Sequence, residues 1–167
     1  MYQICFNIRA MNIQLISLGK TVNPFIHEGI QFYTKRIGKY NAFSSIELSD
    51  VKNAGKLSES ERKKEEGKAL LKFFTPGDYH ILLDEKGKHF SSEKFAQHLQ
   101  HFMNRGYKNL NFYIGGPYGF SEEVYQKAND RVALSEMTFT HEMIRLFFSE
   151  QVYRAFTILK NEPYHHR

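Results

Sequence analysis

The sequence predicts an α/β domain with a largely parallel sheet, because short apolar segments of strand character alternate with longer helical segments. The length agrees with one domain, since 167 residues, 41% of them hydrophobic, supply one ordinary core. We predict that residues 11–167 form this single domain. Residues 1–10 are predicted to be an N-terminal extension, because Met11 stands directly before the first strand-like run. An ordinary flexible N-terminus is the alternative.

Five segments have the pattern of strands. Most are continuous apolar runs, as in strands that are covered on both faces, and one alternates between small polar and apolar residues. The third is followed by an apparent turn at Asp84–Gly87. The predicted strands are Ile13–Leu18, Phe43–Leu48, Tyr79–Leu83, Leu110–Ile114 and Val132–Leu134.

Capping residues predict where the helices begin and end. Asn23 precedes a proline, which favours the first helical position, and Gly38 ends that helix. Ser58 and Glu61 have the spacing of a capping box for a charged helix that runs to about Phe74. The other predicted helices begin at Ser92, Ser121 and Thr140.

The helix that begins after Thr140 is the longest, and its apolar face is wider than one core-facing stripe requires. Ile144, Val152 and Leu159 belong to this face. Such a face suits a helix that packs both on the core and on a second subunit. Burial within one subunit is the alternative.

Composition narrows the class of protein. The formal net charge of +5 favours a polyanionic partner such as nucleic acid, although many globular enzymes are equally basic. A single cysteine, Cys5, excludes an internal disulfide and a cysteine-based zinc site, and we expect no metal. No apolar run approaches the roughly 20 residues that span a bilayer. We therefore expect a cytoplasmic protein that does not insert into a membrane.

Three segments with ligand-binding character follow predicted strands, where parallel sheets bind their ligands. Leu83–Asp84 ends the third strand. Gly115–Gly119 is a glycine loop that allows close approach of a ligand, but it is neither a dinucleotide fingerprint nor a P-loop. Leu134–Phe139 mixes apolar side chains with hydroxyls, a combination that is able to bracket an adenine ring while the backbone binds the edge of the base. The alternatives are a tight turn without ligand for the loop and a buried connector for the last segment.

The C-terminal tail carries further candidates. Tyr164 and His165 offer groups for proton transfer, and Arg167 offers a guanidinium that can bind phosphate. A frayed terminus is the alternative. On the last predicted helix, Arg145 and Arg154 are expected on the same broad face, where they can hold a phosphate or a carboxylate. Solvent-exposed arginines are again the alternative.

Several of these motifs occur in a specific order. They are Ile13–Gly19 with Lys20, Leu83-Asp84-x-x-Gly87, Ile114-Gly115-Gly116-x-x-Gly119, Leu134-Ser135-x-Met137-Thr138-Phe139-x-His141, and Asn161-x-Pro163-Tyr164-His165. As an ordered set over residues 11–167, they resemble the ribosomal large-subunit pseudouridine N3-methyltransferases of the SPOUT (α/β-knot) superfamily. The resemblance implies a sheet flanked by helices with a C-terminal trefoil knot.

The resemblance also implies an activity and a site. Members of this family work as homodimers that methylate a pseudouridine of 23S ribosomal RNA in the assembled ribosome, and the partner's tail completes each substrate site. The residues expected to bind S-adenosylmethionine are Leu83, Gly115, Leu134, Ser135, Glu136, Met137, Thr138 and Phe139.

The remaining expectations concern chemistry and RNA. His165 or Tyr164 is the candidate base that removes the N3 proton, with Arg154 stabilising the negative charge that develops on the ring. The residues expected to contact RNA are Arg145, His141 and Arg167, and Tyr118 either stacks on RNA or faces solvent. A non-enzymatic RNA-binding module of α/β fold is the rival hypothesis. A hydrolase is disfavoured, because no G-x-S-x-G motif is present.

Overall fold

The computed structural model describes residues 11–165, so the extension predicted for residues 1–10 and the candidate Arg167 lie outside the described residues. Its strands form one parallel sheet in the order β2-β1-β4-β3-β5, which confirms the predicted α/β class. The strands are β1 (Asn12–Leu18), β2 (Phe43–Leu48), β3 (Tyr79–His89), β4 (Asn109–Ile114) and β5 (Asp130–Ala133).

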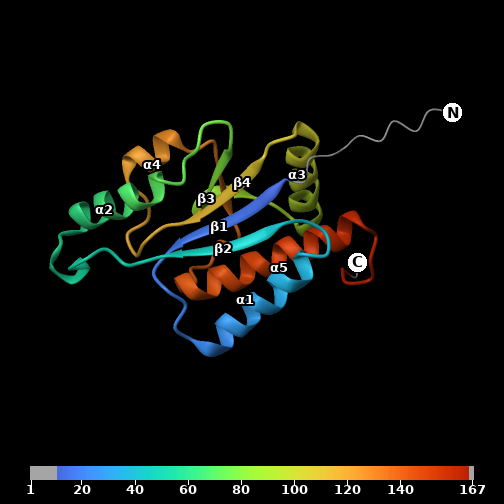
Figure 1. Cartoon of the computed structure of the whole chain (residues 1–167), viewed down its shortest axis with the longest axis horizontal. Helices are drawn as coiled ribbons and strands as arrows, with labels where there is room; N and C mark the ends of the chain where they lie inside the picture. The colour runs from blue at the N-terminus through green and yellow to red at the C-terminus, as the bar shows by residue number, and fades with distance from the viewer. Residues whose placement is uncertain (1–10, 166–167) are drawn as a thin grey trace.

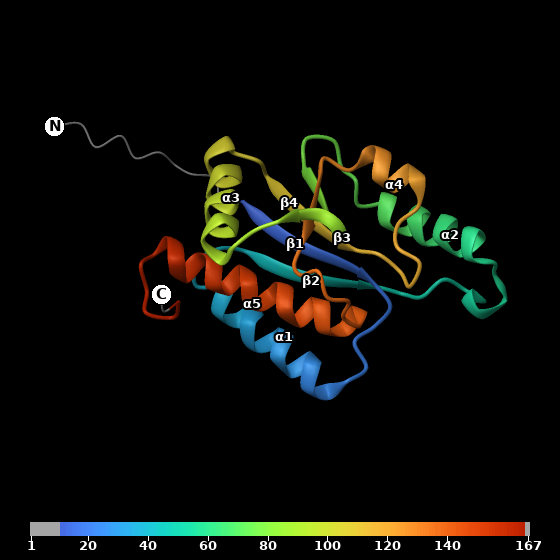
Figure 2. The same cartoon turned by 180° about the vertical axis from the view of Figure 1, so that it is seen from behind.

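Helices cover both faces of the sheet (Figures 1 and 2). One layer consists of α1, α3 and α5, with α5 between the other two, and the opposite layer consists of α2 and α4. No helix within residues 11–165 is both long and apolar enough to cross a membrane. The helices are α1 (Pro24–Ile37), the short 3₁₀ helix η1 (Ala54–Lys56), α2 (Glu59–Leu71), α3 (Ser92–Arg105), α4 (Glu122–Lys127) and α5 (His141–Leu159).

The strands are apolar because both of their faces are buried. In β1, Ile13 and Leu15 belong to the core beneath α1, α3 and α5, whereas Ile16 belongs to the core beneath α2 and α4. In β4, Phe112 and Tyr113 divide in the same way between the two cores. Side chains of a strand alternate between its faces, so a strand covered on both sides must be apolar throughout.

Most of the predicted helix starts are confirmed by their caps. The side chain of Asn23 accepts a hydrogen bond from the backbone N–H of Phe25 at 3.0 Å. Ser58 and Glu61 form the complete capping box. The hydroxyl of Thr140 accepts from the backbone N–H of Met143 at 3.3 Å, so α5 begins where the sequence predicts. Because caps satisfy backbone donors that the helix itself leaves free, they are dependable boundary signals.

Two helix boundaries were predicted wrongly. Ser91, and not Ser92, caps α3, because its hydroxyl accepts from the backbone N–H of Lys94. Helix α2 ends at Leu71 rather than near Phe74, whose ring instead stacks on His80 with ring centroids 4.4 Å apart.

The turn predicted at Asp84–Gly87 is also wrong, because β3 continues through it to His89. Its pairing with β5 shifts register between Leu83 and Lys88, so the segment forms an irregularity within the strand instead of ending it. Correspondingly, β5 covers Asp130–Ala133, two residues earlier than predicted at its start. The trefoil knot implied by the resemblance concerns the path of the chain, which strand order does not define, and it stays a prediction.

A buried histidine lies in the α2 and α4 side of the core. His80 is 6% exposed, and its Nδ1 lies 2.9 Å from the hydroxyl of Tyr113 while its Nε2 lies 3.2 Å from the carbonyl of Thr75. Burial lowers the pKa of His80 below its usual value, because the charged imidazolium loses hydration.

We expect the free energy of unfolding to fall as the pH is lowered from about 7.5 to about 5.5. The unfolded chain takes up a proton at His80 near pH 6.5, whereas the folded chain resists it, so stability is lost below that pH. Thermal denaturation at both pH values measures the effect. In His80→Gln the pH dependence should be smaller, although not absent, because burial also lowers the pKa of His98. The exposed His27→Gln is the control, and equal pH dependence in all three proteins would contradict the prediction.

Candidate active site

The irregular segment of β3 that follows Leu83 and the carboxyl ends of β4 and β5 surround a pocket of about 420 Å³. This volume lies in the usual range for small-molecule sites. The three segments that the sequence places at strand ends all line it, so their predicted convergence is confirmed. Of the residues predicted to bind a cofactor, Glu136 is absent from the lining. Those that line the pocket are Leu83, Gly115, Leu134, Ser135, Met137, Thr138 and Phe139.

The glycine loop after β4 folds back tightly on itself. Gly116 pairs with Gly119 in an antiparallel bridge, and Gly119 has a φ of +80°, which favours glycine. A Cβ on Gly115 would lie 3.1 Å from the carbonyl of Gly119, and one on Gly116 would overlap the carboxylate of Glu66. The absence of side chains therefore lets the loop pack closely while its backbone lines the pocket.

A hydrogen bond between β3 and α4 shapes one wall of the pocket. The hydroxyl of Tyr125 donates to Oδ2 of Asp84 at 2.6 Å, and Oδ1 of Asp84 accepts from the backbone N–H of Lys86 at 2.8 Å. The pKa of Tyr125 is raised to about 12, mainly by burial and secondly by this hydrogen bond to the carboxylate. The phenol therefore stays protonated and keeps Asp84 in place as an acceptor.

The segment between β5 and α5 forms the opposite wall. The hydroxyl of Ser135 accepts from the backbone N–H of Met137 at 2.9 Å, which turns the chain. The side chain of Met137 is 72% exposed beside the pocket, and Phe139 packs edge-on against Phe147. This exposure is inconsistent with the alternative that the segment is merely a buried connector.

His141 and Tyr118 lie at the rim of the pocket. The imidazole of His141 is partly open to solvent, yet the protein around it and the positive charge of Arg145 lower its pKa. Tyr118 is 48% exposed, with the guanidinium of Arg62 5.8 Å from its ring centroid. The Nε of Arg62 donates to Glu66 at 2.7 Å. The pocket therefore has an aromatic ring and an imidazole among its lining residues, and a guanidinium lies beside the aromatic ring.

Arg145 differs from its predicted role. It is 1% exposed, and its guanidinium donates to the carbonyl of Leu18 at 2.6 Å, to the hydroxyl of Thr21 at 2.8 Å and to Glu47 at 3.2 Å. Its donors tie the N-terminal half of α5 to the ends of β1 and β2, so a role in holding an RNA phosphate is not supported. The expectation that Arg145 and Arg154 share a face is wrong as well, because nine residues advance a helix by about 900°, half a turn out of phase.

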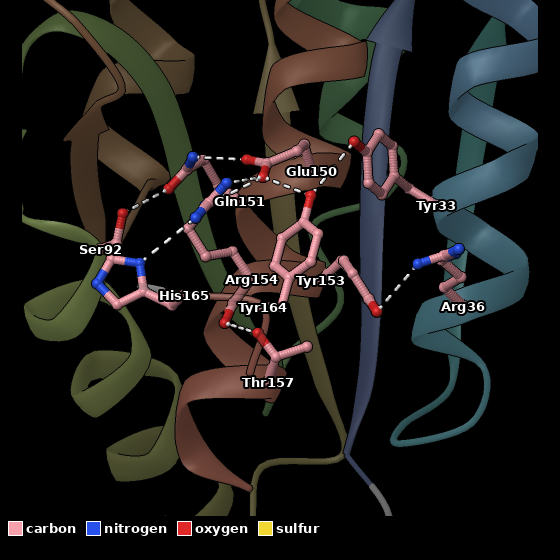
Figure 3. A network of polar contacts seen from close by, with 10 residues as sticks. All are labelled: Tyr33, Arg36, Ser92, Glu150, Gln151, Tyr153, Arg154, Thr157, Tyr164 and His165. Carbon is pink, nitrogen blue, oxygen red and sulfur yellow. Dashed lines mark hydrogen bonds and ion pairs between the residues drawn. The ribbon is translucent and has the colours of Figure 1, made fainter. Parts of the chain in front are cut away.

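Arg154, Tyr164 and His165 lie together at the other end of α5 (Figure 3). Nη1 of Arg154 lies 3.4 Å from Nδ1 of His165, and its guanidinium lies over the ring of Tyr164 at 4.8 Å. His165 Nε2 lies 3.0 Å from a carboxylate oxygen of Glu93, and this hydrogen bond lowers the pKa of Glu93 to about 2. The three residues predicted as catalytic therefore form one cluster, folded against α3 and α5 instead of fraying.

The pocket and this tail cluster are separate in one chain. His141 borders the pocket, whereas Arg154 lies thirteen residues further along α5, which is about 20 Å at the helical rise. A ligand in the pocket therefore cannot touch the tail of its own chain in this conformation.

The comparisons with known proteins decide the family. A family model described as "Predicted SPOUT methyltransferase" matches residues 11–165. The chain belongs to the SPOUT methyltransferase family. Relatives of this SPOUT protein from Flavobacterium psychrophilum and Flavobacterium johnsoniae are each 54% identical over 157 residues, which is 94% of this chain and 100% of theirs. Both relatives carry the name "Ribosomal RNA large subunit methyltransferase H".

Solved structures agree with this SPOUT assignment at the level of fold. A tRNA (m1G37) methyltransferase from Aquifex aeolicus superposes with a TM-score of 0.53 at 13% identity, over 93% of this chain and 75% of that one. A probable methylase family protein from Haemophilus influenzae gives a TM-score of 0.53 at 10% identity, over 90% of this chain and 67% of that one. Identities this low support the shared fold alone.

Sequence reasoning did not identify the carboxylates that organise the tail of this SPOUT chain. Glu150 precedes Arg154 by four residues on a helix, which is the spacing of an ion pair, so this signal was present in the sequence. Glu93 carried no comparable signal, because it reaches His165 from a different helix far away in the sequence.

The burial of Arg145 leads to a prediction about stability. Arg145→Ala should lower the free energy of unfolding by about 3 kcal/mol, because it removes a large buried side chain, the cation that pairs with Glu47 and the donor to the carbonyl of Leu18. Urea denaturation measures the change, and Arg105→Ala, at an exposed position, is the control. A change below about 0.5 kcal/mol, the range of surface substitutions, would contradict the structural role.

Proposed function

We propose that this SPOUT methyltransferase transfers a methyl group from S-adenosylmethionine to N3 of a pseudouridine in 23S ribosomal RNA, on the assembled ribosome in the cytoplasm. The observation that carries the proposal is that the three segments with ligand-binding character, Leu83–Asp84, Gly115–Gly119 and Leu134–Phe139, line one pocket. The near full-length similarity to proteins named as large-subunit ribosomal RNA methyltransferases supports the substrate class.

The lining of the pocket fits S-adenosylmethionine. Leu83, Leu134 and Phe139 supply apolar surface for the adenine ring, while the hydroxyls of Ser135 and Thr138 and the adjacent backbone can bind polar edges. The carboxylates of the lining residues Asp84 and Glu85 suit the positive charge of a sulfonium. When bound, S-adenosylmethionine supplies an electrophilic methyl group. Glu136 is outside the lining, so any part that it plays comes through its neighbours in the chain.

We further propose that the protein acts as a homodimer. Large apolar side chains on and before α1 are exposed, with Val22 at 80%, Phe25 at 70% and Phe32 at 50%, which is the surface that a second copy would cover. The separation of the pocket from the tail cluster supports the same conclusion. A partner's tail would bring to each pocket the proton-accepting and cationic groups that this pocket's own chain holds about 20 Å away.

The tail residues can perform distinct parts of the reaction. The N3 proton must leave as the new N–C bond forms, and His165 is the proposed base. Arg154 would stabilise the negative charge that develops on the ring carbonyls. Tyr164 is a poorer base, because burial and hydrogen bonds with Tyr33 and Glu150 raise its pKa well above the usual value and keep it protonated. His141 at the rim, and Arg167 in the tail, remain the proposed contacts for RNA.

Calorimetry tests the cofactor assignment. The purified protein should bind S-adenosylmethionine, and Gly115→Val should weaken the affinity at least about tenfold. The reason is that the branched side chain forces Gly119 and the loop backbone out of place. Gly55→Val is the matched control, because a Cβ there meets nothing within 4 Å. Unchanged affinity in a folded Gly115→Val protein would remove this pocket from the proposed function.

Deletion of residues 164–167 tests the contribution of the tail. Methyl transfer from radiolabelled S-adenosylmethionine to ribosomes lacking the modification should fall about 100-fold or more, the usual contribution of an acid–base group. Cofactor affinity should be retained, since the tail lies far from the pocket of its own chain.

Light scattering tests the oligomeric state. The full-length protein should give twice the chain mass of 19.7 kDa.

Mixing the tail-deleted chain with a Gly115→Val chain provides a test of sharing between subunits. One site of such a heterodimer has an intact pocket from one chain and an intact tail from the other, so partial activity should return. A clean monomer, or full activity in the truncated homodimer, would contradict the shared site.

A further inference from the structure

The side chain of Glu150 binds two residues of the tail cluster directly, Arg154 and Tyr164, and Arg154 in turn contacts His165. One carboxylate oxygen, Oε1, accepts from Arg154 Nε at 3.0 Å and Nη2 at 2.6 Å, and from the hydroxyl of Tyr164 at 3.1 Å. The other oxygen accepts from the amide of Gln151 at 2.7 Å, and Gln151 in turn accepts from the hydroxyl of Ser92 on α3. Figure 3 shows this network. The carboxylate is 17% exposed, so little of it remains for solvent.

These contacts restrict what Tyr164 can do. A carboxylate only accepts hydrogen bonds, so the hydroxyl of Tyr164 must donate its proton to Glu150. The ring is held by Tyr153, with centroids 4.8 Å apart, and by the guanidinium of Arg154. Tyr164 therefore fixes the position of the tail on α5. Because His165 is the next residue along the chain, its position is restricted as well.

The contacts of His165 determine which nitrogen of its imidazole carries the proton. A guanidinium can only donate, so Nδ1 of His165 must accept from Arg154 through its lone pair. Nε2 then carries the proton and donates to Glu93. The nitrogen that is able to take a proton is therefore the one beside Arg154, whose orientation the two bonds to Glu150 fix.

We propose that Glu150 is a positioning residue for methyl transfer, which holds Arg154 and Tyr164 so that Nδ1 of His165 is presented as the proton acceptor. This inference rests on the proposed function. Glu150 acts through the tail of its own chain and so serves the pocket of the other subunit.

Glu150→Gln tests the proposal in the full-length dimer. The variant keeps the shape but loses the charge, so kcat for ribosome methylation should fall roughly 10- to 100-fold, as misplaced catalytic groups do. The affinity for S-adenosylmethionine and KM for ribosomes should stay near wild type.

Glu123→Gln is the matched control, because Glu123 also pairs with a basic residue four positions later on a helix, yet lies on α4. Its kinetics should equal wild type. Should Glu150→Gln fail to fold, Glu150→Asp keeps the charge but shortens the reach to Arg154 and Tyr164, and it should also lower kcat without changing the affinity for S-adenosylmethionine. Unchanged kcat in the folded Glu150→Gln variant, or a loss confined to cofactor affinity or KM, would overturn the proposal.

A complementation test separates a role through the tail from a general loss of structure. A Glu150→Gln chain mixed with a Gly115→Val chain should regain partial activity, whereas one mixed with a tail-deleted chain should not. Restoration by the tail-deleted chain, or none by Gly115→Val, would overturn the inference. If the wild-type protein transfers no methyl group to ribosomes, the proposed function fails. If wild type is active and Glu150→Gln has the same kcat, only the inference about Glu150 fails.

Discussion

Strand β4 lies at the centre of a sheet in which all of the strands run the same way, and it pairs with both β1 and β3. In a parallel sheet each strand must be followed by a crossover before the next can begin, so the helices cover the faces and the loops gather at the edges. The irregular segment within β3 and the loops that follow β4 and β5 therefore lie side by side. The pocket exists because of this common direction, and the residues that line it are distant in sequence.

Helix α5 fixes the position of the tail relative to the sheet. Near its start, His141 borders the pocket, and Arg145 is tied by its guanidinium to the ends of β1 and β2. Near its end, Glu150 and Arg154 hold the tail. Because a packed helix is stiff along its axis, the tail cluster has a defined position relative to the sheet. The buried arginine thus serves the site indirectly, by fixing the element on which the other groups are mounted.

The features that can be predicted from the sequence are those that depend on a few neighbouring residues. The capping box of Ser58 and Glu61 needs only four consecutive positions, and the glycine loop at Gly115–Gly119 is recognisable without its surroundings. The segment Asp84–Gly87 has the composition of a turn, but its pairing with β5 keeps it in the strand, which is a tertiary effect that local propensity does not contain. The structural role of Arg145 could not be predicted for the same reason, because its carboxylate partner Glu47 lies 98 residues away in the sequence.

The distance between pocket and tail along α5 has a consequence for how the activity depends on the amount of protein. If each working site needs a pocket from one chain and a tail from another, a solitary chain is catalytically silent however well it is folded. Specific activity then declines on dilution below the concentration at which dimers dissociate, while cofactor binding per chain does not. With such a shared site, newly made chains in a growing cell would contribute nothing until they meet, and the onset of modification would follow pairing rather than folding.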